Sequence, residues 1–258
     1  MKFRPKTISM SKKVSYRIRR VIAVILAVGA FCAYLILSPN SYEYEALLNP
    51  GIKDASEIPL KAEQTKADST KAIDVLENLA VQEKNTSEKY YRKLFYDNWG
   101  IDAHGCSTRE VILNRDLKNT VLKGCKVQSG ILEDPYTGQT IEFVRGQDTS
   151  AAVQIDHVVA LSNAWATGAY QLDASTRYEL SQDPLNLLAV EGQANQDKSD
   201  GAADTWLPPN EAFRCQYVAR QISVKYKYHL WVTPAEKSTM LKVLALCPNE
   251  PTVGLQIQ

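Results

Sequence analysis

Residues 154–161, with the sequence Gln-Ile-Asp-His-Val-Val-Ala-Leu, decide the fold of this chain, because an acid and a histidine stand side by side in an apolar run. A short apolar run of this kind predicts a β-strand. A second apolar stretch, from Leu187 to Val190, predicts another strand, and Gly192 to Lys198 predicts the start of a helix. The sequence therefore predicts two strands and a helix around the Asp-His pair.

The pair suits hydrolysis of a phosphodiester, which needs a base for water and a metal to stabilise charge. His157 is the candidate general base, because an unperturbed histidine titrates near working pH. Asp156 is the candidate ligand for Mg²⁺, or for Mn²⁺. Adjacent strand residues point to opposite faces. The two can therefore share one site only where the strand bends, or where the metal lies at its edge.

Three polar residues downstream can complete such a site. Asn195, on the predicted helix, can offer its amide oxygen as a second metal ligand. Asn186 can hydrogen-bond the imidazole of His157 and fix its orientation. Lys198 lies three residues after Asn195, so it shares that helix face and is a candidate phosphate contact.

Two arginines are further candidates. Arg109 can contact a phosphate or the transition state, since a guanidinium group suits bidentate phosphate binding, although it can equally pair with Glu110 or Asp116. Arg145 precedes the first strand and is a candidate for substrate binding.

The rest of the globular part combines helices with strands, which predicts an α+β fold. Thr108 to Leu113 and about Asn210 to Tyr228 predict helices, and Lys126 to Val144 predicts a β-hairpin with its turn at residues 134–138. The last helix has a clear start, with Thr233 as N-cap followed by proline and a Thr-x-x-Glu capping box.

The charge distribution argues against a polycation that binds nucleic acid through its overall field. Of the 30 basic residues, eight lie in residues 1–40, which leaves 22 basic residues against all 29 acidic ones in the remainder. A polyphosphate partner would therefore need a local basic patch and a metal ion.

The N-terminus predicts export. Basic residues precede an apolar segment at Val21–Leu37, which orients the N-terminus to the cytoplasm. Its length allows either a single-pass signal anchor or a cleaved signal peptide, and a buried core helix is a third alternative. The expected organisation is a cytoplasmic basic tail at 1–20, a transmembrane segment at 21–37, a linker or stalk at 38–69, a globular domain at 70–248 and a tail at 249–258.

The cysteines agree with export, because disulfides persist in oxidising compartments. Apart from Cys32 in the apolar segment there are four, and four cysteines permit three pairings. Their grouping in the chain suggests the pairs Cys106–Cys125 and Cys215–Cys247. Four reduced core cysteines are the alternative.

The order of strand with Asp-His, strand opened by Asn, and helix with Asn resembles the ββα-metal finger of HNH endonucleases. The chain is most similar to the exported family related to the C-terminal nuclease domain of GmrSD-type enzymes. Matching stretches lie at 91–95, 106–116, 156–161, 195–198, 206–209 and 215–217, and at the helix around Val224. The resemblance implies a metal-dependent endonuclease domain at 70–248 that cleaves DNA or also RNA. It gives the base role to His157, the metal to Asp156 and Asn195, and the orienting role to Asn186.

The sequence departs from the expected pattern at three places. Ala160 stands where the family usually has proline, and the acid-rich segment before the first cysteine is reduced to residues 102–105. Asn195 stands at the last position of the finger, where HNH proteins often have histidine. A non-enzymatic alternative follows, namely a membrane-tethered nucleic-acid-binding or surface interaction protein on a decayed nuclease fold. A phosphatase is a weaker enzymatic alternative. The expected partners are nucleic acid and the membrane, with no protein partner evident.

Overall fold

The computed structural model describes residues 70–146 and 149–254. The expected basic tail, transmembrane segment and linker lie outside these residues, as does the end of the C-terminal tail. No helix in the described ranges is long and apolar enough to cross a membrane. The expectation of a membrane span at 21–37 therefore concerns residues outside the description.

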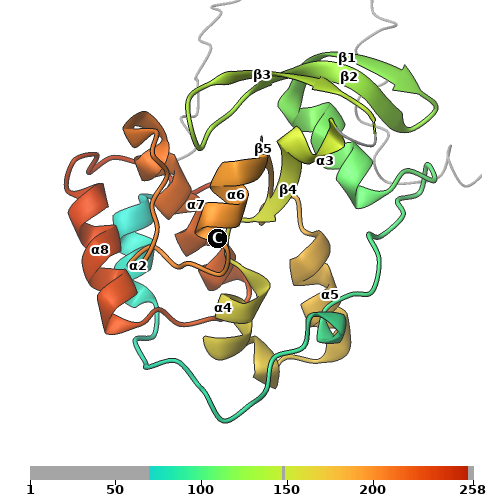
Figure 1. Ribbon diagram of the computed structural model, residues 1–258. Coiled ribbons are helices and arrows are strands. Elements are labelled where there is room, and N and C mark those ends of the chain that lie inside the picture. The colour runs from blue at the N-terminus through green and yellow to red at the C-terminus, as the bar shows by residue number, and fades with distance from the viewer. Residues whose placement is uncertain (1–69, 147–148, 255–258) are drawn as a thin grey trace, which may run out of the picture. The chain divides into compact units, whose positions relative to one another are not determined.

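The described chain is a mixed α/β structure with two small sheets (Figure 1). Its elements follow in this order: α2 (Ala72–Asn78), η3 (Arg92–Leu94), α3 (Thr108–Asp116), β1 (Leu117–Lys123), β2 (Lys126–Glu133), β3 (Thr140–Val144), η4 (Ser150–Ala152), β4 (Val153–His157), α4 (Leu161–Ala166), η5 (Ala169–Gln171), α5 (Ala174–Gln182), β5 (Leu187–Glu191), α6 (Gly192–Lys198), η6 (Glu211–Phe213), α7 (Arg214–Lys227) and α8 (Pro234–Leu244).

The first sheet has three antiparallel strands in the order β1-β2-β3. The predicted hairpin is its β2–β3 half. Strand β1 was not predicted, because it is an edge strand whose only buried side chain is Leu117. The register with β2 also shifts beside Asn119, which has a positive φ of 53°. Neither a regular alternation nor an apolar run therefore marks this strand in the sequence.

The second sheet consists of β4 and β5, which pair antiparallel from Val153 opposite Glu191 to His157 opposite Leu187. Helix α6 begins at the residue after β5. The sequence predicted both strands and this helix. Residues buried in α3, in both sheets and around Leu187 form one apolar cluster, so the two sheets and α3 pack on a common core.

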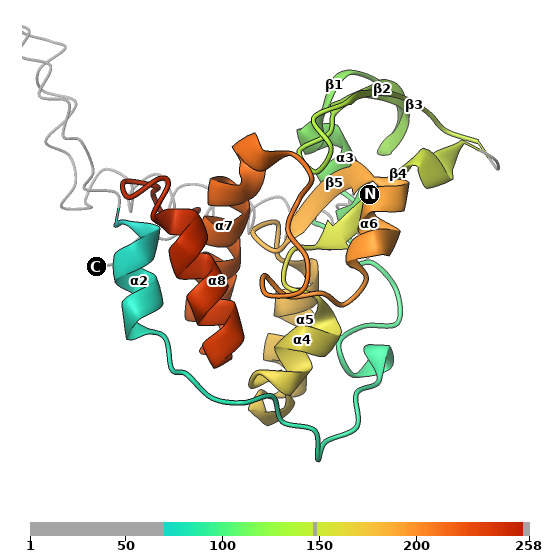
Figure 2. The same ribbon diagram turned by 60° about the vertical axis from the view of Figure 1, so that its left-hand side comes forward.

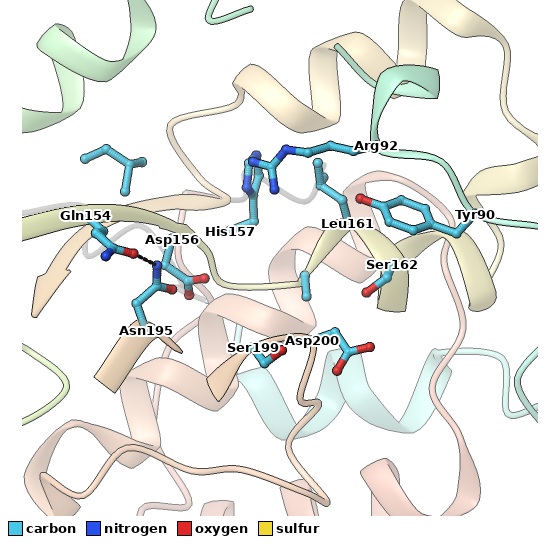
Figure 3. A pocket seen from close by; sticks show the side chains of 12 residues that line it. Tyr90, Arg92, Gln154, Asp156, His157, Leu161, Ser162, Asn195, Ser199 and Asp200 are labelled. Atoms are coloured by element: carbon cyan, nitrogen blue, oxygen red, sulfur yellow. Dashed lines mark hydrogen bonds between the residues drawn. The ribbon is translucent and has the colours of Figure 1, made fainter. Parts of the chain in front are cut away.

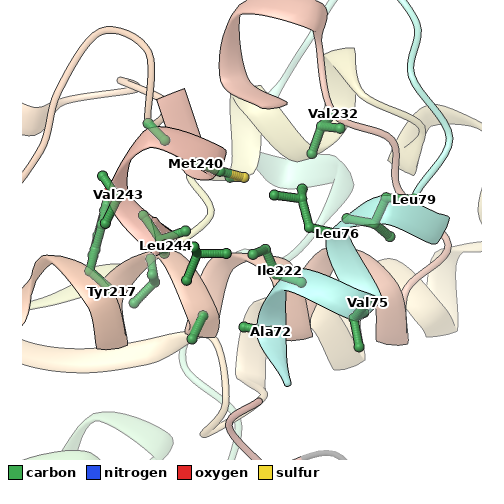
Figure 4. Close-up of a cluster of buried hydrophobic side chains, with 14 of the residues drawn as sticks. Ala72, Val75, Leu76, Leu79, Tyr217, Ile222, Val232, Met240, Val243 and Leu244 are labelled. Atoms are coloured by element: carbon green, nitrogen blue, oxygen red, sulfur yellow. The ribbon is translucent and has the colours of Figure 1, made fainter. Parts of the chain in front are cut away.

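A helical layer of α2, α7 and α8 packs beside this unit (Figure 2). Leu76 of α2, Ile222 of α7 and Met240 of α8 are fully buried and meet in one cluster (Figure 4). Each fully buried aliphatic side chain stabilises the fold by about 1.5–3 kcal/mol relative to exposure. This layer therefore provides a rigid support for the chain segments that carry the site.

A buried ion pair joins α7 to α8. The Lys225 Nζ lies 3.0 Å from Glu236 Oε1 and also donates to the Trp231 carbonyl oxygen at 2.9 Å. Glu236 is at the same time the glutamate of the predicted Thr-x-x-Glu capping box, at the third position of the helix, and its two hydrogen bonds with Thr233 are both present. One carboxylate thus caps α8 and neutralises a buried lysine.

Two disulfides are present, and they are the pairs that the grouping of the cysteines suggested. Cys106–Cys125 ties the segment before α3 to the turn between β1 and β2, and Cys215–Cys247 ties the first turn of α7 to the residues after α8. They close loops with sequence separations of 19 and 32 residues. Loops of this length correspond to roughly 3–4 kcal/mol each when the effect is treated as loss of unfolded-state entropy.

The cap of α8 gives a first test. Thr233→Ala removes the oxygen that accepts a hydrogen bond from the Glu236 amide at 3.1 Å. Loss of such a cap should lower the free energy of unfolding by about 1–2 kcal/mol, measured by urea denaturation. Ser238→Ala, in the exposed middle of the same helix, is the matched control and should stay within about 0.5 kcal/mol of wild type. Equal stability of the two variants would contradict the capping role.

Candidate active site

A cavity of about 610 Å³ opens beside β4, and four consecutive residues of that strand, 154–157, line it. Successive side chains of a strand point to opposite faces, so a cavity that touches all four lies along the strand's edge. Strand β4 pairs only with β5 in this sheet, which leaves its other edge open. The geometrical condition for Asp156 and His157 to share one site is therefore met.

Asn195 reaches the same cavity from α6, as the spacing predicted. Its Nδ2 donates a hydrogen bond of 2.8 Å to Gln154 Oε1. The bond uses the amide nitrogen and leaves the Asn195 Oδ1 available for a ligand. Figure 3 shows the Asn195 amide lying next to the Asp156 carboxylate.

The Asp156 carboxylate is buried and held at both oxygens. Oδ2 accepts from the Tyr136 hydroxyl at 2.5 Å, and Oδ1 accepts from Lys198 Nζ at 3.0 Å. Burial raises the pKa of Asp156, and the Lys198 charge with these hydrogen bonds acts in the opposite direction. Each carboxylate oxygen has a second lone pair, so a metal can still bind.

Lys198 does not lie where a contact with phosphate was expected. Its side chain is 0% exposed, and its Nζ donates to both Asp156 Oδ1 and the His157 carbonyl oxygen. It shares the helix side of Asn195, as predicted, but lies deeper than the cavity. Its charge therefore balances Asp156 and links α6 to β4.

The His157 imidazole is fixed by the end of α5 and by an aromatic ring. Nε2 lies 2.9 Å from the Ser181 carbonyl oxygen, and the Trp99 ring stacks on the imidazole with centroids 5.9 Å apart. A carbonyl oxygen only accepts, so Nε2 carries the proton and Nδ1 is the free basic nitrogen. Burial, with smaller effects from the Arg92 and Lys198 charges, lowers the pKa of His157 to about 3. The ring is therefore neutral near pH 7, and its pKa lies well below the value near working pH that the sequence led us to expect for the base.

Asn186 does not hydrogen-bond the imidazole, contrary to the expectation. Its fully buried amide binds the backbone of Val159 on both sides, accepting from the N–H at 2.8 Å and donating to the carbonyl at 3.2 Å. The Val158 N–H also donates to the Asn186 carbonyl oxygen. Asn186 thus fixes the turn that follows His157, and Ser181 orients the ring.

The two candidate arginines lie away from the cavity lining. Arg145 makes a double contact with Glu110 at 2.6 and 2.7 Å and donates to the Val127 carbonyl oxygen. The Arg109 Nη2 donates to the Val153 carbonyl oxygen at 3.3 Å. Arg145 therefore braces α3 against β2, and Arg109 braces α3 against the start of β4.

Tyr90, Arg92 and Ser162 are among the lining residues that were not predicted as site residues. Tyr90 and Arg92 belong to a segment that is about 65 residues before His157 in the chain. The signal that could have found them is the mixture of aromatic and basic residues at 90–95. Such a mixture does not by itself tell which side chain turns into a cavity.

The chemistry of the donors fits a hard divalent cation. Asp156 and Asn195 offer one carboxylate and one amide oxygen, which are ligands that Mg²⁺ accepts together with water. In the described ranges, one group of three His, Cys, Asp or Glu ligand atoms is close enough for a metal, at Cys215, Cys247 and Glu250. Its two sulfurs form a disulfide and are not thiolates. The cavity at β4 is therefore the better candidate metal centre.

The family model of the C-terminal domain of GmrSD restriction endonucleases matches residues 78–243. The chain belongs to this family. The match contains every residue that lines the cavity. Membership confirms the resemblance to the C-terminal domain of GmrSD-type enzymes, indicates a nuclease-type function with nucleic acid as partner, and suggests a divalent metal.

A relative from Arthroderma benhamiae, named "Uncharacterized secreted protein", is 34% identical to the chain over 209 residues. The similarity covers 80% of this chain and 99% of the relative. The common part is therefore nearly the whole of the relative.

The buried lysine gives a second test. Lys198→Met removes the cation beside a buried carboxylate, which should lower the free energy of unfolding by about 3–5 kcal/mol in urea denaturation. Lys126→Met, at an exposed position of β2, is the control and should change it by no more than about 0.5 kcal/mol. If the Lys198→Met protein had wild-type stability but bound nucleic acid more weakly, the result would support the original expectation that Lys198 contacts phosphate.

Proposed function

We propose that this protein is a metal-dependent, HNH-type endonuclease that hydrolyses phosphodiester bonds of nucleic acid, in the first place DNA, outside the cytoplasm. One observation carries the proposal. A neutral histidine with a free Nδ1 lines the same cavity as a carboxylate and an amide oxygen, in a chain of a restriction endonuclease family. The unit β4-β5-α6 supports a ββα-metal core, because it supplies all three groups in the order expected of that motif.

His157 acts as general base. Its Nδ1 takes a proton from a water molecule as the water oxygen forms a bond to phosphorus. The bond from phosphorus to the leaving oxygen breaks, and that oxygen receives a proton from solvent. The other ring proton stays on Nε2 and is donated to the Ser181 carbonyl oxygen. This hydrogen bond fixes the neutral tautomer with a free Nδ1 before the proton transfer.

Asp156 and Asn195 would hold the metal, with Mg²⁺ as the first choice and Mn²⁺ as the second. A bound ion supplies positive charge for the phosphate and the leaving oxygen. Gln154 supports the arrangement, because it holds the amide nitrogen of Asn195. Lys198 and Tyr136 support the metal site from the protein interior, because they hold the Asp156 carboxylate in place.

Action outside the cytoplasm rests on the sequence and on the relative. The basic residues before the apolar segment at 21–37 favour an anchored or secreted chain. The two disulfides suit an oxidising compartment. The relative that is named as secreted favours the secreted form.

The base is tested with the purified full chain on DNA duplex, single-stranded DNA and RNA in Mg²⁺. His157→Ala should lower kcat by about 10²–10⁴-fold, the usual contribution of a general base. His104→Ala removes an exposed loop histidine and should leave the rate unchanged. EDTA should abolish wild-type cleavage, and excess Mg²⁺ should restore it.

Three results would contradict parts of this proposal. Full activity of the His157→Ala protein would remove His157 as base. Saturable binding of DNA without cleavage in any divalent metal would favour a binding protein on a decayed nuclease fold. Faster hydrolysis of a small phosphomonoester than of DNA would favour a phosphatase.

The metal site has its own test. Asn195→Ala removes one ligand oxygen but leaves Asp156 and its partners intact. The Mg²⁺ concentration for half-maximal cleavage should rise by about tenfold or more, as for loss of a supporting group at a metal site. Gln193→Ala, an exposed residue of the same helix, should leave this concentration unchanged. An unchanged requirement in Asn195→Ala would exclude Asn195 as a ligand.

A further inference from the structure

We propose that Arg92 binds a phosphate of the substrate in the part of the cavity beside His157. Tyr90 and Ser162, which line the same part of the cavity, provide neighbouring hydroxyl donors. In Figure 3 the Arg92 guanidinium group is drawn over the His157 ring, with the Asp156–Asn195 pair to the left and Tyr90 and Ser162 to the right. This inference rests on the proposed function and names the residue that holds the substrate there.

The first argument is charge. Two acids, Asp156 and Asp200, line the cavity and repel a phosphodiester. Among the lining residues in the described chain, Arg92 is the one with a positive charge. The charge of Lys198 is already used by Asp156. A phosphate that reaches His157 therefore meets Arg92 as the one cationic side chain among the described lining residues.

The second argument is the position of the guanidinium group. It stacks over the Tyr96 ring, with Cζ 5.1 Å from the ring centroid, and its Nη2 donates to the Tyr96 hydroxyl. The Tyr96 ring in turn packs against the His157 imidazole, with centroids 5.9 Å apart. Tyr96 thus contacts both the guanidinium group of Arg92 and the imidazole of His157.

The third argument is unused bonding capacity. A guanidinium group has five N–H donors in a planar fork. Among the described residues, the Arg92 side chain makes one hydrogen bond, to the Tyr96 hydroxyl. No carboxylate of these residues forms an ion pair with Arg92. The remaining donors suit two phosphate oxygens at once.

The fourth argument is that the backbone around Arg92 is fixed before substrate arrives. The Trp165 Nε1 donates to the Glu88 carbonyl oxygen at 2.9 Å, before η3. The Arg177 Nε donates to the Leu94 carbonyl oxygen at 3.0 Å, at the last residue of η3. A charge held in advance stabilises a transition state without a reorganisation cost.

Lys93 provides a matched control, because it is the next residue of η3 and also has a positive charge. Its side chain is exposed, lies 6.0 Å from the Tyr91 ring centroid and is not part of the cavity lining. A general effect of charge on this segment would appear in both variants. A specific phosphate contact would appear in Arg92 variants alone.

The test compares Arg92→Met, Arg92→Lys and Lys93→Met in the full chain. Cleavage of a labelled DNA duplex in Mg²⁺ gives kcat/KM, and anisotropy of the same duplex in EDTA gives affinity at several salt concentrations. Arg92→Met should lower kcat/KM by about 10²–10³-fold. It should also reduce the slope of log affinity against log salt by about 0.9, the value for one phosphate contact.

The two other variants separate charge from geometry. Arg92→Lys should recover part of the rate, because it keeps the charge and loses the planar fork. Lys93→Met should match wild type in rate and in salt slope. Thermal melting of all variants identifies a folding defect, and Arg92→Lys keeps the test valid if Arg92→Met does not fold.

The outcomes distinguish this inference from the proposed function. A wild type that cleaves, with Arg92→Met equal to Lys93→Met in rate and slope, overturns the phosphate contact and leaves the nuclease in place. A wild type that binds duplex with an Arg92-dependent slope but never cleaves supports the contact and overturns the nuclease. A wild type that neither binds nor cleaves overturns both.

Discussion

The buried ion pair between Lys198 and Asp156 is the interaction on which the site depends. Lys198 Nζ, from the end of α6, reaches both the Asp156 carboxylate and the His157 carbonyl oxygen on β4. An unpaired carboxylate at this depth would be driven toward the protonated form by desolvation. A protonated acid is a poor metal ligand, and the Lys198 charge lowers the pKa of Asp156 against the larger effect of burial, so it favours the ionised form that a metal needs. The same bonds join the helix to the strand and set the distance between Asp156 and Asn195.

Much of the fold follows from local signals. The strands β4 and β5, the helix α6, the hairpin β2–β3 and the start of α8 were all predicted from apolar runs, turn residues and a capping box. Strand β1 was missed because an edge strand with one buried residue has no periodicity to detect. The sequence could narrow the possible disulfide pairings only by the grouping of the cysteines along the chain, since the pairing depends on the folded structure. Local patterns thus predict elements whose burial repeats along the sequence, and they miss elements whose burial does not.

The residues of the candidate site also fall into those that local sequence patterns predict and those that they miss. Asp156, His157 and Asn195 could be predicted because they belong to neighbouring elements of one short unit. Ser181 and Arg92 could not, because they come from 24 and about 65 residues away and reach His157 only through tertiary packing. Lys198 was placed on the correct side of α6 but at the wrong depth, because helical spacing gives direction and not burial.

The charges of the cavity explain how a protein with an acidic main part can act on a polyanion. Lys198, which does not line the cavity, neutralises Asp156, and His157 is uncharged, so the described lining keeps one positive charge on Arg92 and one negative charge on Asp200. A divalent ion would add positive charge beside the phosphate. It would therefore increase both affinity for nucleic acid and readiness for hydrolysis, in addition to the contact with Arg92. On this account the protein needs no broad basic surface, and the excess of acidic over basic residues after residue 40 is compatible with a nuclease.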